Sequence, residues 1–224
     1  MGEGLSRAIQ DYLKVIYALA AEHGRASTNG IAERMGVTPA SVTGMLQKMA
    51  AADPPLVKYE KHRGVRLTEA GENAALEVIR HHRLLEQFLH QTLGFSWDEV
   101  HMEADRLEHV ISEDLEERIA QSLGDPLHDP HGDPIPTRDF QMPERSTTRL
   151  SELRPGGQAR VQRVDNFDAE LLRYLGGLGL TPGAEINVLE YSSFDENLRL
   201  RVAGREEPVV VGERISRQIY VEEI

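Results

Sequence analysis

The sequence predicts a mainly α-helical chain with an all-β C-terminal part: a winged helix-turn-helix, a helical middle region and a small β-barrel. Three observations lead to this fold class. Apolar residues recur at three- and four-residue spacing through most of residues 5–123, which is the period of an amphipathic helix. Two short strand-like runs flank a basic turn at residues 61–64. From residue 156 onward, short β-rich runs alternate with glycine and proline, as is typical of a small β domain.

The first three helices form a compact motif. Residues 5–21 predict an amphipathic helix, and Ser27 or Thr28 can cap a second, short helix. A glycine-containing turn follows, and Thr38 with Pro39 then provides an N-cap and a proline in the first helical position. Two short helices joined by such a turn are typical of a helix-turn-helix.

The strand-like runs 56–60 and 65–67 predict a hairpin, which would be the wing. A recognition helix presents its N-terminal side chains to base edges, and basic side chains around it contact phosphates. The candidates for base contacts are Thr38, Pro39, Ala40, Ser41, Thr43 and Gly44, and those for phosphate contacts are Gln47, Lys48, Lys61 and Arg63. The alternative is a three-helix bundle whose charges are merely solvated. The predicted wing favours DNA binding.

The middle region carries a pattern suited to divalent metal. Thr68 can cap a helix over 69–92, and Ser96 with Glu99 fits a capping box for a helix running to about residue 111. His82 and Glu86 are one turn apart, and a second face would hold His101, Asp105, Glu108 and His109. Imidazoles and carboxylates without thiolate suit Mn²⁺, Fe²⁺, Co²⁺ or Zn²⁺. The alternative is a polar seam between two helices.

Charge is distributed unevenly over the 224 residues. The net charge is −12, which taken as a whole argues against a nucleic-acid partner. Residues 1–73 carry +1, residues 74–145 carry −10 together with seven of the nine histidines, and residues 146–224 carry −3. An acidic, histidine-rich block beside a near-neutral DNA-binding region predicts weak DNA binding in the absence of a cation.

Composition excludes several classes of protein. The chain has no cysteine, which excludes a disulfide scaffold, a Cys-ligated zinc finger and a thiol nucleophile. No apolar run approaches the ~20 residues that span a bilayer. The first four residues lack the basic and apolar regions of a signal peptide. We therefore expect a cytoplasmic protein with no membrane partner.

The residues resemble the diphtheria-toxin-repressor family of iron- and manganese-dependent transcriptional regulators. The resemblance covers nearly the whole chain. Its specific segments are 11–17, 31–34, 82–86, 101–110 and 133–136. It implies a non-enzymatic regulator, with no small-molecule substrate, that binds a palindromic double-stranded DNA operator as a dimer when loaded with metal. The implied domains are a winged helix-turn-helix (1–73), a helical metal-binding and dimerisation domain (74–142), a proline-containing linker (143–155) and an SH3-like, FeoA-type barrel (156–224).

The resemblance also implies the metal ligands. His82, Glu86 and His101 match one site. Asp11, Asp105, Glu108 and His109 match a second, and Asp168 or Glu170 of the barrel is a further candidate. Iron-responsive members place Met and Cys where Asp11 and Asp105 stand, so Mn(II) is favoured, followed by Fe(II), with Co, Zn or Cd as substitutes in vitro.

Two departures and two alternatives accompany this interpretation. Lys14 stands where small manganese-responsive members carry Glu, and Leu171 stands where a Gln ligand is expected. The alternatives are a winged-helix regulator that responds to an organic ligand, and a helical metalloenzyme.

Overall fold

A computed structural model describes residues 4–60, 63–165 and 168–224. The chain forms two compact units. The first runs to His82 and includes Leu107–Ile111 and Pro136–Met142, and the second comprises Arg83–Arg106, Ser112–Ile135 and Pro143–Ile224. None of the described helices has the length and apolar character needed to cross a bilayer.

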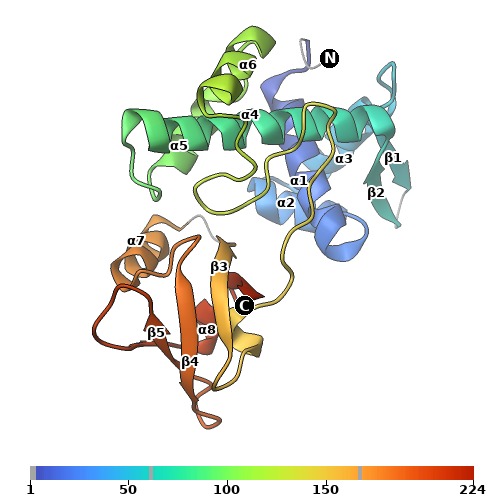
Figure 1. Cartoon of the computed structure of the whole chain (residues 1–224). Coiled ribbons are helices and arrows are strands. Elements are labelled where there is room, and N and C mark those ends of the chain that lie inside the picture. Colours follow the sequence, from blue (N-terminus) through green and yellow to red (C-terminus); the bar gives the residue numbers. More distant parts are fainter. Residues whose placement is uncertain (1–3, 61–62, 166–167) are drawn as a thin grey trace. The chain divides into compact units, whose positions relative to one another are not determined.

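The first unit contains the predicted helix-turn-helix. Its elements are α1 (Arg7–His23), α2 (Thr28–Met35), α3 (Pro39–Ala50), β1 (Val57–Glu60), β2 (Gly64–Leu67) and the first part of α4 (Glu69–Leu93) (Figure 1). Ser27 caps α2 by accepting a hydrogen bond from the Gly30 amide at 3.0 Å, and Thr38 caps α3 by accepting from the Ser41 amide at 3.2 Å. Gly36, at a φ of 66°, ends α2 in the left-handed conformation that the tight turn requires.

One apolar core holds these helices together. Its fully buried side chains lie at helical spacing on the three helices: Leu13, Ile16, Ile31, Val42, Leu46 and Met49. The hairpin pairs antiparallel from Val57 opposite Leu67 to Glu60 opposite Gly64. The winged helix-turn-helix prediction is therefore confirmed, although Lys61 lies outside the described residues.

The helix predicted over 96–111 is shorter than expected. The Glu99 side chain reaches back to Ser96, where it accepts from the backbone amide at 3.3 Å and from the hydroxyl at 2.7 Å. The helix α5 nevertheless spans only Val100–Leu107. Residues 108–110 form a turn. The prediction that Glu108 and His109 share a helical face with His101 is therefore wrong. The apolar periodicity could not show that the helix ends at Leu107, because the side chains of Glu108 and His109 are held by residues that are distant in the sequence.

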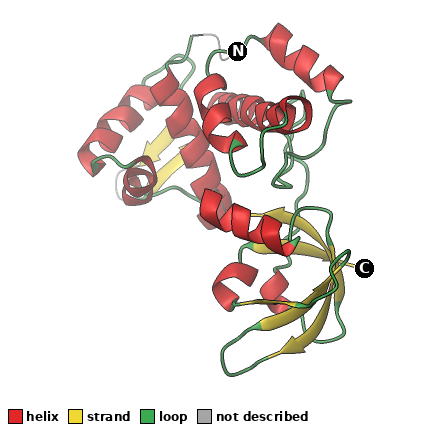
Figure 2. Cartoon of the chain, turned by 90° about the vertical axis from the view of Figure 1, so that its left-hand side faces the viewer, coloured by secondary structure: helices red, strands yellow, loops and turns green. Residues whose placement is uncertain are grey.

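The second unit contains the C-terminal sheet. Its remaining elements are α6 (Glu113–Ser122), the 3-10 turn Leu150–Glu152, β3 (Gln158–Val164), α7 (Ala169–Leu178), β4 (Glu185–Tyr191), β5 (Leu198–Val202), β6 (Val209–Val211), α8 (Glu213–Ser216) and β7 (Ile219–Glu223). The five strands are antiparallel in the order β6-β5-β4-β3-β7. Figure 2 shows the strands in yellow. Their inward side chains form a second apolar core, against which Trp97 packs. This confirms the predicted all-β C-terminal part.

Residues 124–135 form an irregular segment, and part of it is buried. Asp129, His131, Asp133 and Ile135 are at most 6% exposed. The Val164 amide of β3 donates to the His131 carbonyl at 2.9 Å. A Cβ on Gly132 would lie 1.9 Å from the Gln162 carbonyl oxygen. Residues 129–135 therefore pack against β3, where only glycine allows the close approach.

Candidate functional site

Three predicted ligands meet in the first unit. His109 Nε2 lies 3.0 Å from Asp11 Oδ1 and 3.1 Å from Glu108 Oε1. Asp11 comes from α1, whereas the other two come from the turn after α5. Their ligand atoms are close enough to hold one metal ion. The shortened α5 makes this possible, since its end lets both turn residues face α1.

The orientation of His109 suits a metal ligand. Its Nδ1 donates to the Gln10 side-chain oxygen at 2.7 Å, because an amide oxygen can only accept. This leaves Nε2 as the nitrogen that can offer a lone pair to a metal ion. It is buried and has no hydrogen-bond partner among the described residues. A carbonyl partner on the other ring nitrogen is the usual support of a metal-bound histidine, so these residues fit a divalent ion.

Glu108 is the most constrained member of this group. Its side chain is 1% exposed, and both carboxylate oxygens accept from Lys14 Nζ at 2.7 Å. His82 Nδ1 lies 2.5 Å from Oε2. Burial raises the pKa of Glu108, but the hydrogen bonds and positive charges of His82 and Lys14 outweigh it and hold that pKa below its usual value. Glu108 is therefore an anion surrounded by cationic donors.

In the second unit, the side chains of Glu86 and His101 lie close together. His101 Nδ1 lies 3.0 Å from Glu86 Oε1, and Glu86 is fully buried. Asp105, which the resemblance groups with Asp11, has its carboxylate 3.7 Å from His101 Nε2. His82 precedes Glu86 by one turn of α4.

Sequence reasoning missed a second set of residues around Glu86. Asp129 and His131 can form a metal-sized group with it, and all three are buried. His131 Nδ1 lies 3.7 Å from Glu86 Oε2, and Nε2 donates to the Trp97 carbonyl at 2.7 Å. The histidine-rich composition of residues 74–145 was a signal, but the irregular segment has no period that would show which side chains point inward.

The electrostatics of this set favour a cation. Burial lowers the pKa of His131, but the Glu86 and Asp129 carboxylates raise it to about 9. Burial raises the pKa of Asp129, and the neighbouring Glu86 and Asp133 carboxylates raise it further. Arg83 lies 3.7 Å from both Asp129 and Asp133. Strongly perturbed pKa values of buried groups are typical of functional sites.

The barrel candidates lie in a different environment. Asp168 and Glu170 are exposed at the beginning of α7. Asp168 caps that helix, accepting from the Glu170 amide at 2.9 Å. Within the described part of the chain, the groups able to hold a metal do not include either residue.

The predicted base-contacting side chains lie together at the start of α3. Thr38, Pro39, Ala40 and Ser41 are exposed, and Thr43, which donates to the Pro39 carbonyl at 3.0 Å, is half-buried. Gln47 and Lys48 are exposed one to two turns later. On the hairpin, Arg63 is exposed and forms a weak pair with Glu60 at 3.4 Å. Val42, Leu46 and Met49 face the core, which leaves the polar face of α3 to solvent.

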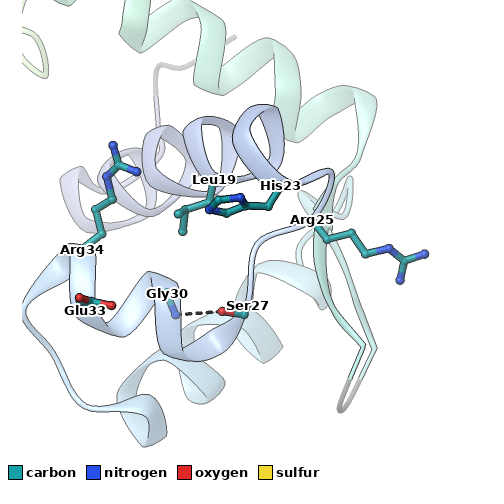
Figure 3. Close-up of a pocket in the computed structure, with 7 residues that line it drawn as sticks. All are labelled: Leu19, His23, Arg25, Ser27, Gly30, Glu33 and Arg34. Atoms are coloured by element: carbon teal, nitrogen blue, oxygen red, sulfur yellow. Dashed lines mark hydrogen bonds between the residues drawn. The ribbon is translucent and has the colours of Figure 1, made fainter. Parts of the chain in front are cut away.

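An open hollow of about 540 Å³ lies beside the helix-turn-helix. Figure 3 shows its seven lining residues: Leu19, His23, Arg25, Ser27, Gly30, Glu33 and Arg34. The Arg25 guanidinium extends away from the others and donates to the Arg63 carbonyl at 3.5 Å. Arg25 was not among the basic residues that the sequence indicated as phosphate contacts. It lies beside the capped N-terminus of α2.

Three family descriptions match the chain in order. They are "Iron dependent repressor, N-terminal DNA binding domain" over residues 4–65, "Iron dependent repressor, metal binding and dimerisation domain" over 68–137, and "FeoA domain" over 148–223.

Individual proteins agree with these matches. The iron-dependent repressor IdeR of Mycobacterium tuberculosis is 33% identical over 189 residues, which is 79% of this chain and 81% of that protein. The regulator MntR of Lysinibacillus sphaericus is 39% identical over 113 residues, which is 50% of this chain and 79% of that protein. A solved manganese-dependent transcriptional repressor in complex with manganese is 37% identical, with a TM-score of 0.85 over 96% of this chain and 100% of that one.

A winged helix-turn-helix combined with buried carboxylate and imidazole groups defines a metal-dependent transcriptional regulator. The chain belongs to the iron-dependent repressor family, and proteins named diphtheria toxin repressor are also among its relatives.

Proposed function

We propose that this regulator is activated by Mn(II), with Fe(II) as the second choice, and that it represses genes of metal-ion homeostasis from a palindromic operator. The observation that carries the proposal is the buried Nε2 of His109, which faces the carboxylates of Asp11 and Glu108. Carboxylate oxygens and imidazole nitrogen without sulfur suit Mn²⁺ and Fe²⁺. Co, Zn and Cd would substitute in vitro, and a solved relative, ScaR, contains Zn²⁺ or Cd²⁺.

Two ligand sets follow from this proposal. Asp11, Glu108 and His109 form the set that links the first helix to the turn after α5. His82, Glu86 and His101 form the other, supported by their helical spacing and by the 3.0 Å contact of Glu86 with His101. The positive charge of the metal ion attracts the carboxylates of both Asp11 and Glu108. Asp11 then holds α1 in place, and α1 packs in the same apolar core as the recognition helix α3.

We expect the DNA-binding form to be a homodimer in the cytoplasm. Large apolar side chains in residues 74–142 remain exposed in the single chain: Leu93, Met102, Val110, Leu115 and Leu127. Exposed apolar side chains of this size are frequent in protein interfaces. In a two-fold dimer, the two copies of α3 reach half-sites about one helical turn apart or a multiple of it.

Metal-dependent operator binding tests the proposal. The probe is a palindromic duplex selected from a random pool by the Mn²⁺-treated protein, and affinity is measured by fluorescence anisotropy with Mn²⁺, anaerobic Fe²⁺ or chelator. Mn²⁺ should strengthen binding about 5- to 150-fold, the usual range of an allosteric coupling. Asp11→Ala and His109→Ala should lose this response, whereas Glu103→Ala, which removes a half-buried carboxylate paired with Arg106, should keep it. A response of wild-type size in both ligand variants would contradict the proposal.

The two alternatives predict different results. A regulator of an organic ligand would bind the same duplex without any effect of Mn²⁺ or Fe²⁺. A metalloenzyme would need an open coordination position and a substrate pocket beside the metal. The family matches favour regulation by DNA binding over catalysis.

A further inference from the structure

A lysine ammonium lies inside the candidate metal group of the first unit. Lys14 follows Asp11 by three residues on α1, so the two side chains lie on the same face of that helix. Its Nζ is 2.7 Å from each carboxylate oxygen of Glu108, which makes the contact bidentate. The Lys14 side chain is 22% exposed and that of Glu108 is 1% exposed. One helix therefore supplies both a candidate ligand and a fixed positive charge.

The ammonium and a metal ion need the same oxygen atoms. Glu108 Oε1 faces His109 Nε2 at 3.1 Å, on the side where the three ligand atoms converge, and the same oxygen accepts from Lys14. A lysine ammonium has three donors and no lone pair, so it cannot coordinate a metal. A divalent ion bound there would also stand beside a like charge in a poorly screened environment.

The neighbouring residues do not remove this conflict. His82 occupies the other oxygen of Glu108 at 2.5 Å. Asp11 contacts His109 Nε2 at 3.0 Å and the Arg7 guanidinium at 4.0 Å, and its side chain is 34% exposed. Among the three candidate ligands, Glu108 alone is paired with a lysine in the described residues.

We propose that Lys14 is a built-in competitor of the activating metal: its ammonium neutralises Glu108 in the metal-free chain, and the ion must displace it to use that carboxylate. This inference rests on the proposed metal role of Asp11, Glu108 and His109. Displacement is feasible because the Lys14 side chain is partly exposed and its flexible four-carbon stem can carry the charge into water. Lys14 thereby sets the metal concentration at which the regulator responds.

Calorimetric titration with Mn²⁺ tests the competition on four full-length, chelator-treated proteins. Lys14→Gln removes the internal cation and should bind the ion of this group at least tenfold more tightly, with the same number of ions per chain. Lys58→Gln makes the same change at an exposed position of β1 and should titrate like wild type. His109→Ala should lose one ion per chain. Equal or weaker Mn²⁺ binding by Lys14→Gln would overturn the proposal.

Thermal unfolding provides a second readout. In chelator, Lys14→Gln should melt below wild type, since buried Glu108 has lost a cationic partner, and Mn²⁺ should raise its melting temperature more than that of wild type. Lys14→Arg keeps the cation and should behave like wild type in both measurements. If Lys14→Gln does not fold in chelator, Lys14→Met replaces it.

The outcomes separate the two ideas. If His109→Ala binds as many ions as wild type with the same affinity, the proposed function of this group fails. If His109→Ala loses an ion while Lys14→Gln matches wild type, only the competition fails.

Discussion

Individual residues of the candidate centre act through pairs that are far apart in the sequence. Gln10 and His109, 99 residues apart, form the hydrogen bond that orients the imidazole. Lys14 and Glu108 are 94 residues apart. The residue types could be read from the sequence because carboxylates and imidazoles at helical spacing are characteristic of metal sites. Their partners could not, because neither pair has a local pattern.

A residue pair in the second unit predicts a pH dependence. Arg173 of α7 donates to Asp98 at 2.9 Å, and the Asp98 side chain is 8% exposed. Burial raises the pKa of Asp98, but hydrogen bonds from Ser96 and Arg173 outweigh it and hold that pKa below 3.8. A carboxyl with a lowered folded-state pKa stabilises the protein above its unfolded pKa, and this contribution is lost as the pH falls through the folded value.

Asp98→Asn should therefore lower the free energy of unfolding at pH 7 by about 0.5–1 kcal/mol, a small effect because Arg173 is largely exposed. The difference from wild type should shrink as the pH falls below 3.8. Urea unfolding at pH 7, 5 and 3.5 measures it. Asp114→Asn, which breaks an exposed pair within α6, is the control. A deficit that is constant at all three pH values would contradict the assignment to ionised Asp98.

At the scale of elements, the sequence located helices and strands well because caps and periodicity are local. Thr68, predicted to cap α4, accepts from the Gly71 amide at 3.1 Å. The predicted end of α5 was wrong. The helix ends at Leu107, and the turn that follows places Glu108 among buried partners. A helix end decided by tertiary contacts leaves no local signal, so the periodicity extended it too far.

The junction of α4 with the strand β1 gives a testable packing constraint. A Cβ on Gly71 would lie 1.9 Å from the Leu56 carbonyl oxygen, which itself accepts from the Thr68 amide at 3.0 Å. Gly71→Ala must move backbone and should destabilise the first unit by about 1–3 kcal/mol. Gly44→Ala, in α3 with nothing within 4 Å of the added Cβ, should instead stabilise it by about 0.5–1 kcal/mol.

Thermal unfolding followed by circular dichroism checks this pair. For a chain of this size, 1 kcal/mol corresponds to roughly 2–4 °C. Equal melting temperatures for the two alanine variants would show that the backbone near Gly71 and Leu56 can move to accept a Cβ without loss of stability.

At the scale of the whole molecule, the net charge of −12 raises the question of how metal promotes DNA binding. Metal could neutralise the acidic block of residues 74–145, or it could fix α1 through Asp11. The salt dependence of DNA binding distinguishes these two explanations, because a repulsion between distant charges weakens as the Debye length shortens.

We expect the geometric effect to dominate. Removal of metal with a chelator should weaken binding to the selected duplex by a factor that stays nearly constant from about 0.05 to about 0.3 M salt, even as both affinities fall through counterion release. Anisotropy titrations at four salt concentrations, with and without Mn²⁺, measure this factor. A factor that approaches one at high salt would favour charge neutralisation instead.

The sequence by itself determined the winged helix-turn-helix, the β-rich C-terminal part and the residue types of a carboxylate–imidazole metal centre. These depend on capping, periodicity and side-chain chemistry, which act over a few residues. Only the tertiary structure decided that Glu108 turns toward Lys14 and His82, and that Asp129 and His131 from an irregular segment join Glu86. Such pairings arise when chain segments pack and bury charges that must then find partners, and that requirement is not encoded in any local period.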